Sequence, residues 1–586
     1  MSIVPAIIVD AHSHAFNAED LPIDGFIKRL APTPKLLTGL VSVPLDRLTQ
    51  WVAPGRREAE RIVQLLGGGA GLESLDGDVV FEAELVSDRE IDRIFAVEWS
   101  RLGMVSAPQG PDGLEGLAPP EISDEDLAEG LRHATPVDLH ELQGWLEEWD
   151  PTLADARVDG LEGLTDLVDY ARSARRAVVQ FVRALRLITR PRYQIAAELA
   201  TSYPTVSLFT PALVDFSATT RDQPRTDVRQ QIAVHSLVAK LSIVGLLPGA
   251  PSTRIAPFVG FDPYREVTET ALSSWNPDLG VASRYAPYGS SPERFSGPAR
   301  FDPTRARRLP VEDGPWDATV LDLSHVTGAI DLVRAAVEIG GFVGVKLYPP
   351  AGFLPLGNAL RFPGTKGEQL DVALHALYGY CVAMDVPILA HAAHSNGFEV
   401  GYDGFAGPAG WELVLADYPT LRLCLGHFGH MHGVGTDPSA PSVDGWPARF
   451  VALIDRYPHV YADVGNSTFA ISAAYRSRFV GLVRALVGTD EPTPEQQKRR
   501  RRMMYGSDFW MNSLSADHGG YLTSFEHDFV TAFDTEFGEA FMGRNALRFL
   551  GFTGDDDGPD PTNLNRRRYV AFHGTHPTPA WLPRGA

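Results

Sequence analysis

Cysteine is scarce in this sequence, and its scarcity restricts the sites that the chain can build. Only Cys381 and Cys424 occur among 586 residues, and each lies within an apolar segment. A disulfide framework and a cysteine-rich zinc site are therefore both excluded. Any metal ion has to be bound by histidine and carboxylate side chains.

Positive charge is also in short supply. Lys and Arg number 52 against 74 Asp and Glu, which gives a formal net charge of −22. Nucleic acids and anionic membranes would repel such a chain, so a small molecule is the expected partner. With 44% hydrophobic and 22% charged residues, the composition is that of a globular protein with a large core.

Long hydrophobic runs are absent from the sequence. No apolar run approaches the roughly 18 residues that a membrane-spanning helix needs. The N-terminus also lacks the charged and apolar regions of a secretory signal peptide. We therefore expect a cytoplasmic protein with neither a membrane nor a nucleic acid as its partner.

Apolar runs that end in polar residues alternate with amphipathic helical patterns, which is typical of parallel β/α units. Eight such units most simply close into a (β/α)8 TIM barrel of the α/β class, with its active site at the carboxyl ends of the strands. The predicted strands cover residues 7–12, 205–214, 255–261, 342–348, 386–391, 421–427, 459–464 and 503–508. The predicted helices cover residues 227–241, 329–340, 366–384, 408–418, 444–457, 473–487 and 524–550.

Two stretches exceed what a minimal barrel needs. Residues 21–199 are far too long for an ordinary connection and contain helical patterns over residues 57–66, 88–102, 139–149 and 161–186. We predict that they form a helical insertion subdomain over the barrel mouth, between parts of a catalytic barrel formed by residues 1–20 and 200–550. Residues 268–315, rich in Pro, Gly, Ser and Arg, predict an irregular lid or packing loop. Residues 551–586 predict a C-terminal tail that is extended or draped over the surface.

The most informative motif follows the first predicted strand. It reads Asp10-Ala11-His12-Ser13-His14. Alternate residues of a strand share a face, so His12 and His14 would point the same way and reach one metal ion. Such a pair alone is more often a surface accident or a satisfied core pair, but His391, His427 and Asp508 close three later strands and would lie at the same end of a barrel.

These residues carry a family resemblance. The Asp-x-His-x-His motif, the two later histidines and the Gly506-Ser507-Asp508 ending resemble the amidohydrolase superfamily. More narrowly, the chain resembles its amidohydrolase-related (amidohydrolase 2) branch, which includes aminocarboxymuconate semialdehyde decarboxylase. The runs that carry the narrower likeness are GVKLYP from residue 344, LGHFG from residue 425, YGSD from residue 505 and GRNALRFLG from residue 543.

The resemblance implies His12, His14, His391 and Asp508 as ligands of one Zn²⁺ ion. Such an ion lowers the pKa of bound water toward about 7. Asp508 would then accept the proton of that water and return it to the leaving group. His427 would either bind a second metal or orient the water and polarise the substrate carbonyl, and the decarboxylase relative favours the second role.

Lys346 decides the expected metal count. In binuclear members of the superfamily, a lysine at this place is carboxylated and bridges two metals. Alternatively, an ordinary ammonium group would bind a substrate carboxylate or pair with an acid. One metal is our expectation, with a second metal at a carboxylated Lys346 as the alternative.

Further polar and aromatic residues near the strand ends are candidates for substrate contact or for supporting the ligands. Asp10 is expected to buttress the first strand rather than touch metal. The remaining candidates are Tyr348, His394, Asn396, Asn466 and Trp510.

The sequence leaves the reaction open. Our first interpretation is a zinc-dependent hydrolase of an amide, lactone or ester bond in a small, carboxylated or cyclic substrate. A non-oxidative decarboxylase or hydratase would use the same ligands, because one site of this fold serves many reactions. A non-catalytic barrel that acts as a binding or scaffold protein is the third possibility, and a homo-oligomer is compatible with each.

Overall fold

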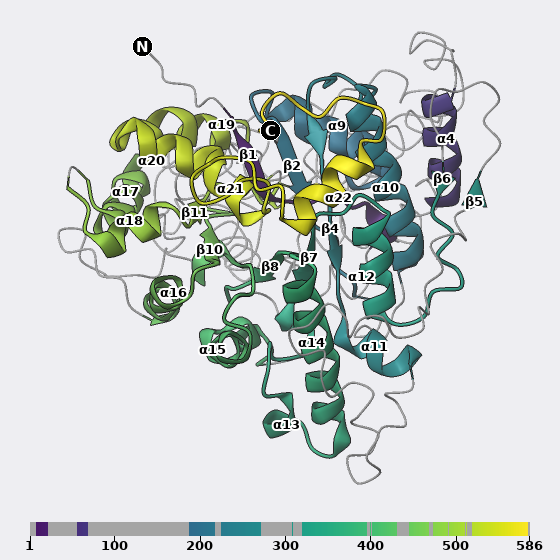
Figure 1. The fold of residues 1–586 in the computed structure, drawn as a ribbon, viewed down its shortest axis with the longest axis horizontal. Helices are drawn as coiled ribbons and strands as arrows, with labels where there is room; N and C mark the ends of the chain where they lie inside the picture. Colours follow the sequence, from purple (N-terminus) through teal and green to yellow (C-terminus); the bar gives the residue numbers. More distant parts are fainter. Residues whose placement is uncertain are drawn as a thin grey trace, which may run out of the picture.

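A computed structural model describes residues 7–20, 55–67, 187–216, 224–270, 307–308, 319–394, 399, 401–429, 445–467, 473–489, 491–509, 511–512 and 518–583. The predicted helices over residues 88–102 and 139–149 lie outside the described residues, as does the predicted helix over 161–186. Asn396 and Trp510 also lie outside them. Figure 1 shows strands in the middle of the described part, with helices around them.

All eight predicted strand segments overlap observed strands. The third prediction, residues 255–261, splits into β3 (Arg254–Ile255) and β4 (Phe258–Gly260). Pro257 lies between them and has no N–H to donate to a neighbouring strand, which accounts for the break. The other strands are β1 (Val9–Ser13), β2 (Leu208–Pro211), β7 (Gly344–Leu347), β8 (Ile388–His391), β9 (Leu423–Gly426), β10 (Val460–Asp463) and β11 (Met503–Met504).

These strands form two parallel sheets, so the α/β class with parallel pairing is confirmed. One sheet has the order β1-β2-β3 and the other the order β11-β10-β9-β8-β7-β4. The predicted closure into a single sheet is not present in the described strands. A short antiparallel pair, β5 (Arg307–Arg308) with β6 (Thr319–Val320), was not predicted.

Backbone hydrogen bonds nevertheless join the two sheets at both edges of the six-stranded sheet. At one edge, Ala212 forms a parallel bridge with Phe258, and the N–H of Leu213 donates to the carbonyl oxygen of Phe258 over 3.0 Å. At the other edge, the N–H of Asp508 donates to the carbonyl oxygen of His12 over 2.7 Å. The end of β1 and the residues after β11 are therefore neighbours.

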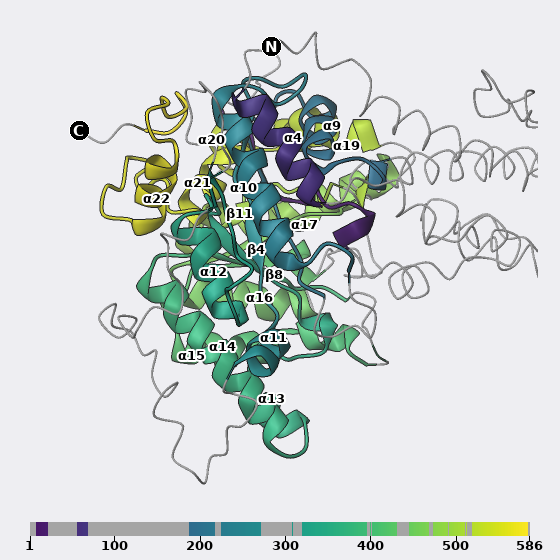
Figure 2. The same cartoon turned by 90° about the vertical axis from the view of Figure 1, so that its right-hand side faces the viewer.

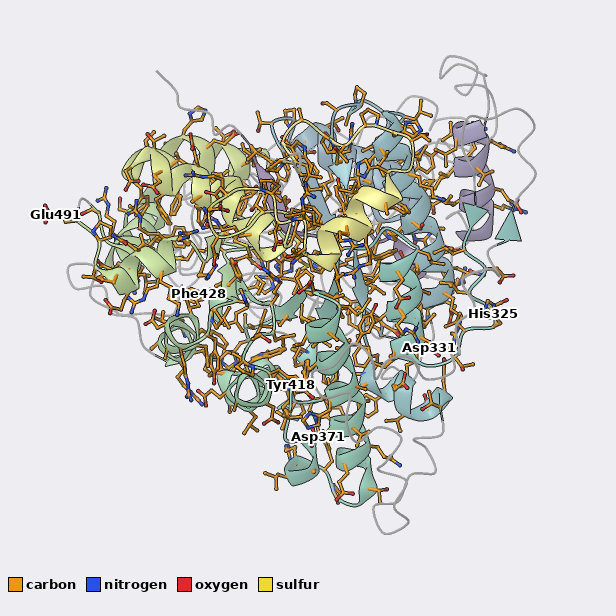
Figure 3. All side chains as sticks on the ribbon, in the orientation of Figure 1. His325, Asp331, Asp371, Tyr418, Phe428 and Glu491 are labelled. Atoms are coloured by element: carbon orange, nitrogen blue, oxygen red, sulfur yellow. The ribbon has the colours of Figure 1, made fainter. Side chains whose placement is uncertain are left out.

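Most predicted helices are present with bounds shifted by a few residues. The matching helices are α4 (Gly55–Gly67), α10 (Val228–Val244), α12 (Ala329–Glu338), α14 (Thr365–Ala383), α15 (Pro408–Asp417), α16 (Gly445–Arg456) and α17 (Ala473–Val487). The described helices that were not predicted include α9 (Arg192–Ser202), α11 (Pro263–Glu269), α13 (Asn358–Arg361) and α18 (Pro494–Arg500). Asp371 on α14 accepts backbone N–H groups of residues 357–359 and so fixes α13 to α14 (Figure 3).

The predicted continuous helix over residues 524–550 is wrong. Phe533 is extended, and the side chain of Asp534 accepts the N–H of Phe537, which begins a new helix. The segment consists of α19 (His518–Thr523), a π-helix (Ser524–Phe529), a 3-10 helix (Val530–Ala532), α20 (Thr535–Glu539), a second π-helix (Ala540–Arg544) and α21 (Asn545–Phe549).

Of the two forms predicted for the tail after residue 551, extended or draped over the surface, the extended form is wrong. Residues 564–572 form α22 (Leu564–Phe572), which lies beside α21 in Figure 2. Phe552, Tyr569 and Leu582 are buried in one apolar cluster with β-strand side chains such as Phe258. The side-chain amide of Asn565 donates to the carbonyl oxygens of Val343 and Leu550 over 2.8 and 2.9 Å. Buried aromatic and aliphatic side chains thus hold the C-terminal segment against the strands.

A buried charge cluster joins the segment after β1 to α4 and α9. The Arg192 guanidinium is fully buried and donates to Asp20 over 2.5 and 2.8 Å and to Glu58 over 2.6 Å. Figures 1 and 2 show α4 alongside α10.

Among the described helices, none is long and apolar enough to cross a membrane.

Candidate metal centre

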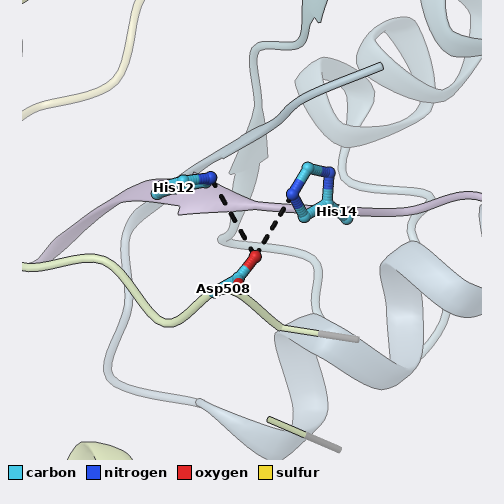
Figure 4. Close-up of side chains that lie close together, drawn as sticks. All are labelled: His12, His14 and Asp508. Atoms are coloured by element: carbon cyan, nitrogen blue, oxygen red, sulfur yellow. Dashed lines mark ion pairs between the residues drawn. The ribbon is translucent and has the colours of Figure 1, made fainter. Parts of the chain in front are cut away.

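The end of β1 brings His12 and His14 to one carboxylate. Oδ1 of Asp508 lies 3.2 Å from Nε2 of His14 and 3.9 Å from Nε2 of His12. Figure 4 shows the Asp508 carboxylate between the two rings. All three residues are buried, and their ligand atoms lie within 4.8 Å of one another, a spacing at which one metal ion can bind all three.

A shift in strand register separates Asp10 from these ligands. Asp10 pairs with Phe209 and Ser13 with Pro211, so three steps along β1 match two steps along β2. Such a bulge changes the phase of the side chains that follow it. Asp10 instead accepts the N–H of Ser507 over 2.9 Å and the N–H of His12 over 3.2 Å.

The Nδ1 atoms of both ligand histidines are held by protein acceptors. Nδ1 of His12 lies 3.1 Å from each oxygen of Asp463, and Nδ1 of His14 lies 2.7 Å from the carbonyl oxygen of Ala212. A carboxylate and a carbonyl oxygen accept hydrogen bonds, so in each neutral ring Nδ1 carries the proton and Nε2 carries the lone pair. This is the tautomer that a metal ligand requires.

The same reasoning extends to the two histidines at the ends of β8 and β9. Nδ1 of His427 donates to the carbonyl oxygen of Gly465 over 3.0 Å, which leaves the lone pair on its Nε2. That Nε2 lies 3.1 Å from Nδ1 of His391 and accepts its proton. In a neutral His391, Nε2 then carries a lone pair as well and can bind a metal ion. His391 itself belongs to neither of the two ligand groups found among the described residues, the second of which is His12, His427 and Asp463.

Lys346 projects from β7 into the same centre. Its Nζ lies 2.8 Å from Nε2 of His12, and both side chains are buried. Burial lowers the pKa of Lys346 to about 8 and, together with the Lys346 charge, lowers the pKa of His12. Burial likewise lowers the pKa of His427 to about 4, so these imidazoles are neutral at pH 7.

Both carboxylates of the centre are ionised. Burial alone would raise the pKa of Asp508, but the neighbouring His14, His427 and His12 side chains hold it well below its usual range. Burial opposes ionisation of Asp463 too, and the contact with His12 nonetheless lowers its pKa. A buried set of neutral imidazoles and ionised carboxylates suits a divalent transition metal better than Ca²⁺ or Mg²⁺.

Left-handed backbone conformations cluster at this end of the strands. His427 has a φ of 63°, Asn466 a φ of 57° and Asp508 a φ of 51°, and they follow β9, β10 and β11. Phe428, labelled in Figure 3, continues the left-handed turn after His427 with a φ of 45°. Non-glycine residues in this region are strained, and such residues concentrate at functional sites.

The other predicted residues lie at various places around the centre. The Tyr348 ring lies 4.8 Å from the His391 ring between centroids. Asn466 is partly exposed next to Gly465. His394 stacks on Trp446 with 3.9 Å between centroids and is exposed, which places it away from the buried ligands.

Asp463 is a described residue of the centre that the sequence reasoning missed. It is the last residue of β10 and lies one residue before the end of the strand predicted over residues 459–464. Besides His12, its Oδ1 accepts the N–H groups of His427 and Gly465 over 3.1 and 2.9 Å. The position at a strand end was therefore an available signal, but the residue matched no motif of the resemblance.

We expect Asp463→Asn to weaken zinc binding about 10- to 100-fold, the usual effect of removing a carboxylate behind a histidine ligand. The amide removes the negative charge that holds the Nδ1 proton of His12. Competition with a chelating indicator would measure the affinity. Asp534→Asn, which makes the same change at the helix cap of α20, should leave zinc affinity unchanged; equal affinities of both variants and wild type would contradict the role of Asp463.

A comparison with known protein families gives a match to part of the chain. Residues 304–552 match the family described as "Amidohydrolase". The match covers less than half of the chain; it includes Lys346, His391, His427, Asp463 and Asp508, but not His12 and His14. It does not single out the decarboxylase relatives, and no curated protein and no solved structure gives a significant match. The region from residue 304 to residue 552 therefore belongs to the amidohydrolase superfamily.

Proposed function

We propose that the chain is a metal-dependent hydrolase that uses one Zn²⁺ ion to cleave an amide, lactone or ester bond of a small molecule. The observation that supports this proposal most strongly is the arrangement of His12 and His14. The Nε2 atoms of both rings face Oδ1 of Asp508, while their Nδ1 atoms donate to other acceptors. His391 would complete the ligand set through Nε2. When bound, zinc would supply water with a pKa near about 7.

Asp508 is suited to transfer a proton. Its carboxylate is ionised at neutral pH and therefore ready to accept the proton of the attacking water. Its N–H donates to the carbonyl oxygen of His12, which fixes the carboxylate beside β1. Asp508 would then return the proton to the leaving group.

For His427 we propose a different role from the one that the resemblance suggested. A neutral His427 donates from Nδ1 to Gly465, so its Nε2 has no proton with which to polarise a substrate carbonyl. Its Nε2 instead accepts from His391. We propose that His427 orients His391 rather than contacting the substrate.

We also propose that the strands form a closed barrel. Backbone hydrogen bonds join the two sheets at β2 with β4 and at β1 with the residues after β11. A ring of eight parallel strands with short interruptions at these two places would bring every proposed ligand to the carboxyl ends of the strands, where enzymes of this fold place their sites.

Metal content per chain tests the proposal most directly. We expect about one zinc in wild-type protein and a loss of that zinc in the His12→Ala/His14→Ala variant, because three protein ligands are typical of catalytic zinc. A panel of lactones, amides, esters and carboxylated aromatic acids should then show hydrolysis. Release of carbon dioxide without hydrolysis would contradict the hydrolase and identify a decarboxylase, and a chain free of metal under zinc-replete conditions would refute the mechanism.

A further inference from the structure

The buried amine of Lys346 contacts the atom of His12 that a metal ion needs. Nζ lies 2.8 Å from Nε2, and neither side chain is reached by solvent to more than a few per cent. Because Asp463 holds the Nδ1 proton of His12, Nε2 has no proton of its own. The Lys346 N–H is therefore the donor in this contact, and the His12 lone pair is the acceptor.

The ammonium group also balances the negative charge of the centre. Asp463 and Asp508 are both buried and lie 3.1 and 3.9 Å from the ring nitrogens of His12, the residue that Lys346 contacts. A buried carboxylate that lacks a cationic partner is strongly destabilising. Lys346 thus places its amine beside two buried carboxylates, where a cation is favourable.

We infer that Lys346 is an internal substitute for the metal, which occupies the His12 lone pair in the metal-free protein and competes with the metal for it. One lone pair cannot serve an N–H donor and a metal ion together, so metal binding has to break the Lys346–His12 hydrogen bond. Two cations side by side in a buried site also repel each other. The inference rests on the proposed metal site and adds to it a residue that weakens metal binding while stabilising the metal-free fold.

The test compares wild type with Lys346→Met, which keeps most of the length of the side chain and removes its charge and its donors. Chelator-treated proteins are titrated with zinc against a competing indicator, and their melting temperatures are measured with and without zinc. We expect Lys346→Met to bind zinc about tenfold more tightly or better, since a hydrogen bond from a charged group no longer has to be broken. Without zinc it should melt below metal-free wild type, and saturating zinc should remove that difference.

Two further variants keep the test decisive. Lys346→Gln retains an N–H donor without the charge and should bind zinc with an affinity between those of wild type and Lys346→Met, which covers the case in which Lys346→Met folds poorly. Lys366→Met removes an exposed lysine that lies over the rings of Tyr264 and Phe362 and should change neither zinc affinity nor the response of melting to zinc.

Weaker or unchanged zinc binding in Lys346→Met and Lys346→Gln would overturn the inference. A mass increase of one carboxyl group on Lys346 in the wild type would overturn it as well, because a carboxylated lysine would be an anionic ligand. Tighter zinc binding without hydrolysis by any variant would support the inference and refute the hydrolase proposal. Zinc binding by none of the proteins would refute both.

Discussion

Asp508→Asn should lower kcat by about 10²- to 10⁴-fold, the range over which general acid–base groups contribute. The amide has nearly the size of the carboxylate but does not accept the proton of an attacking water. Asparagine also tolerates the left-handed conformation that Asp508 adopts, so the backbone should be retained. The rate is measured with the best substrate of the panel at saturating zinc, together with the zinc content of the variant.

A matched control exists in the C-terminal segment. Asp557 has a φ of 61°, close to that of Asp508, and its carboxylate binds Arg548 over 2.5 Å. Asp557→Asn makes the same chemical change in the same backbone conformation and should leave kcat unchanged. A loss of less than about tenfold in zinc-loaded Asp508→Asn would remove Asp508 from the proton transfer.

Arg192→Met should lower the free energy of unfolding by about 3–5 kcal/mol, the usual effect of removing one partner of a buried ion pair. The variant leaves the carboxylates of Asp20 and Glu58 buried without their cation. Denaturant unfolding followed by circular dichroism measures the change. Since these residues connect the segment after β1 to α4 and α9, the loss should appear in the main unfolding transition.

Two comparisons separate this effect from a general sensitivity of the region. Arg190, two residues earlier, is 37% exposed and lies 3.8 Å from Glu198, so Arg190→Met should change stability by less than about 1 kcal/mol. Adding Asp20→Asn and Glu58→Gln to Arg192→Met removes the unpaired charges and should recover much of the loss. Equal stability of Arg190→Met and Arg192→Met would disprove the importance of the cluster.

The strands were predictable because each is a short apolar run that ends at a polar residue. Their observed bounds lie within a few residues of the predictions, and Pro257 explains the one strand that is split. The helical break at Asp534 was less visible, since the flanking residues continue a helical pattern on both sides. The helix α22 was missed because Pro, Gly and Asp dominate the residues before it, while its contacts with the strands depend on the fold as a whole.

The candidate site was predictable to the extent that motifs mark it. His12 and His14 were expected to share a face, and they do lie together beside Asp508. The register shift in β1 and the contacts of Asp463 depend on the tertiary structure, and no local sequence pattern indicates them. The role of Lys346 was open for a similar reason: whether a lysine faces a carboxylate, a substrate or an imidazole depends on residues hundreds of positions away.

The contact between Asp10 and Ser507 joins the first and last parts of the candidate site. These residues are 497 positions apart, and the bond between them lies next to both His12 and Asp508. During synthesis, the histidines leave the ribosome long before the aspartate that completes their group exists. Closing so long a loop is slow relative to local folding. We therefore expect nascent chains that end before residue 508 to carry His12 and His14 without their carboxylate partner, so that metal loading is one of the last events in the maturation of this protein.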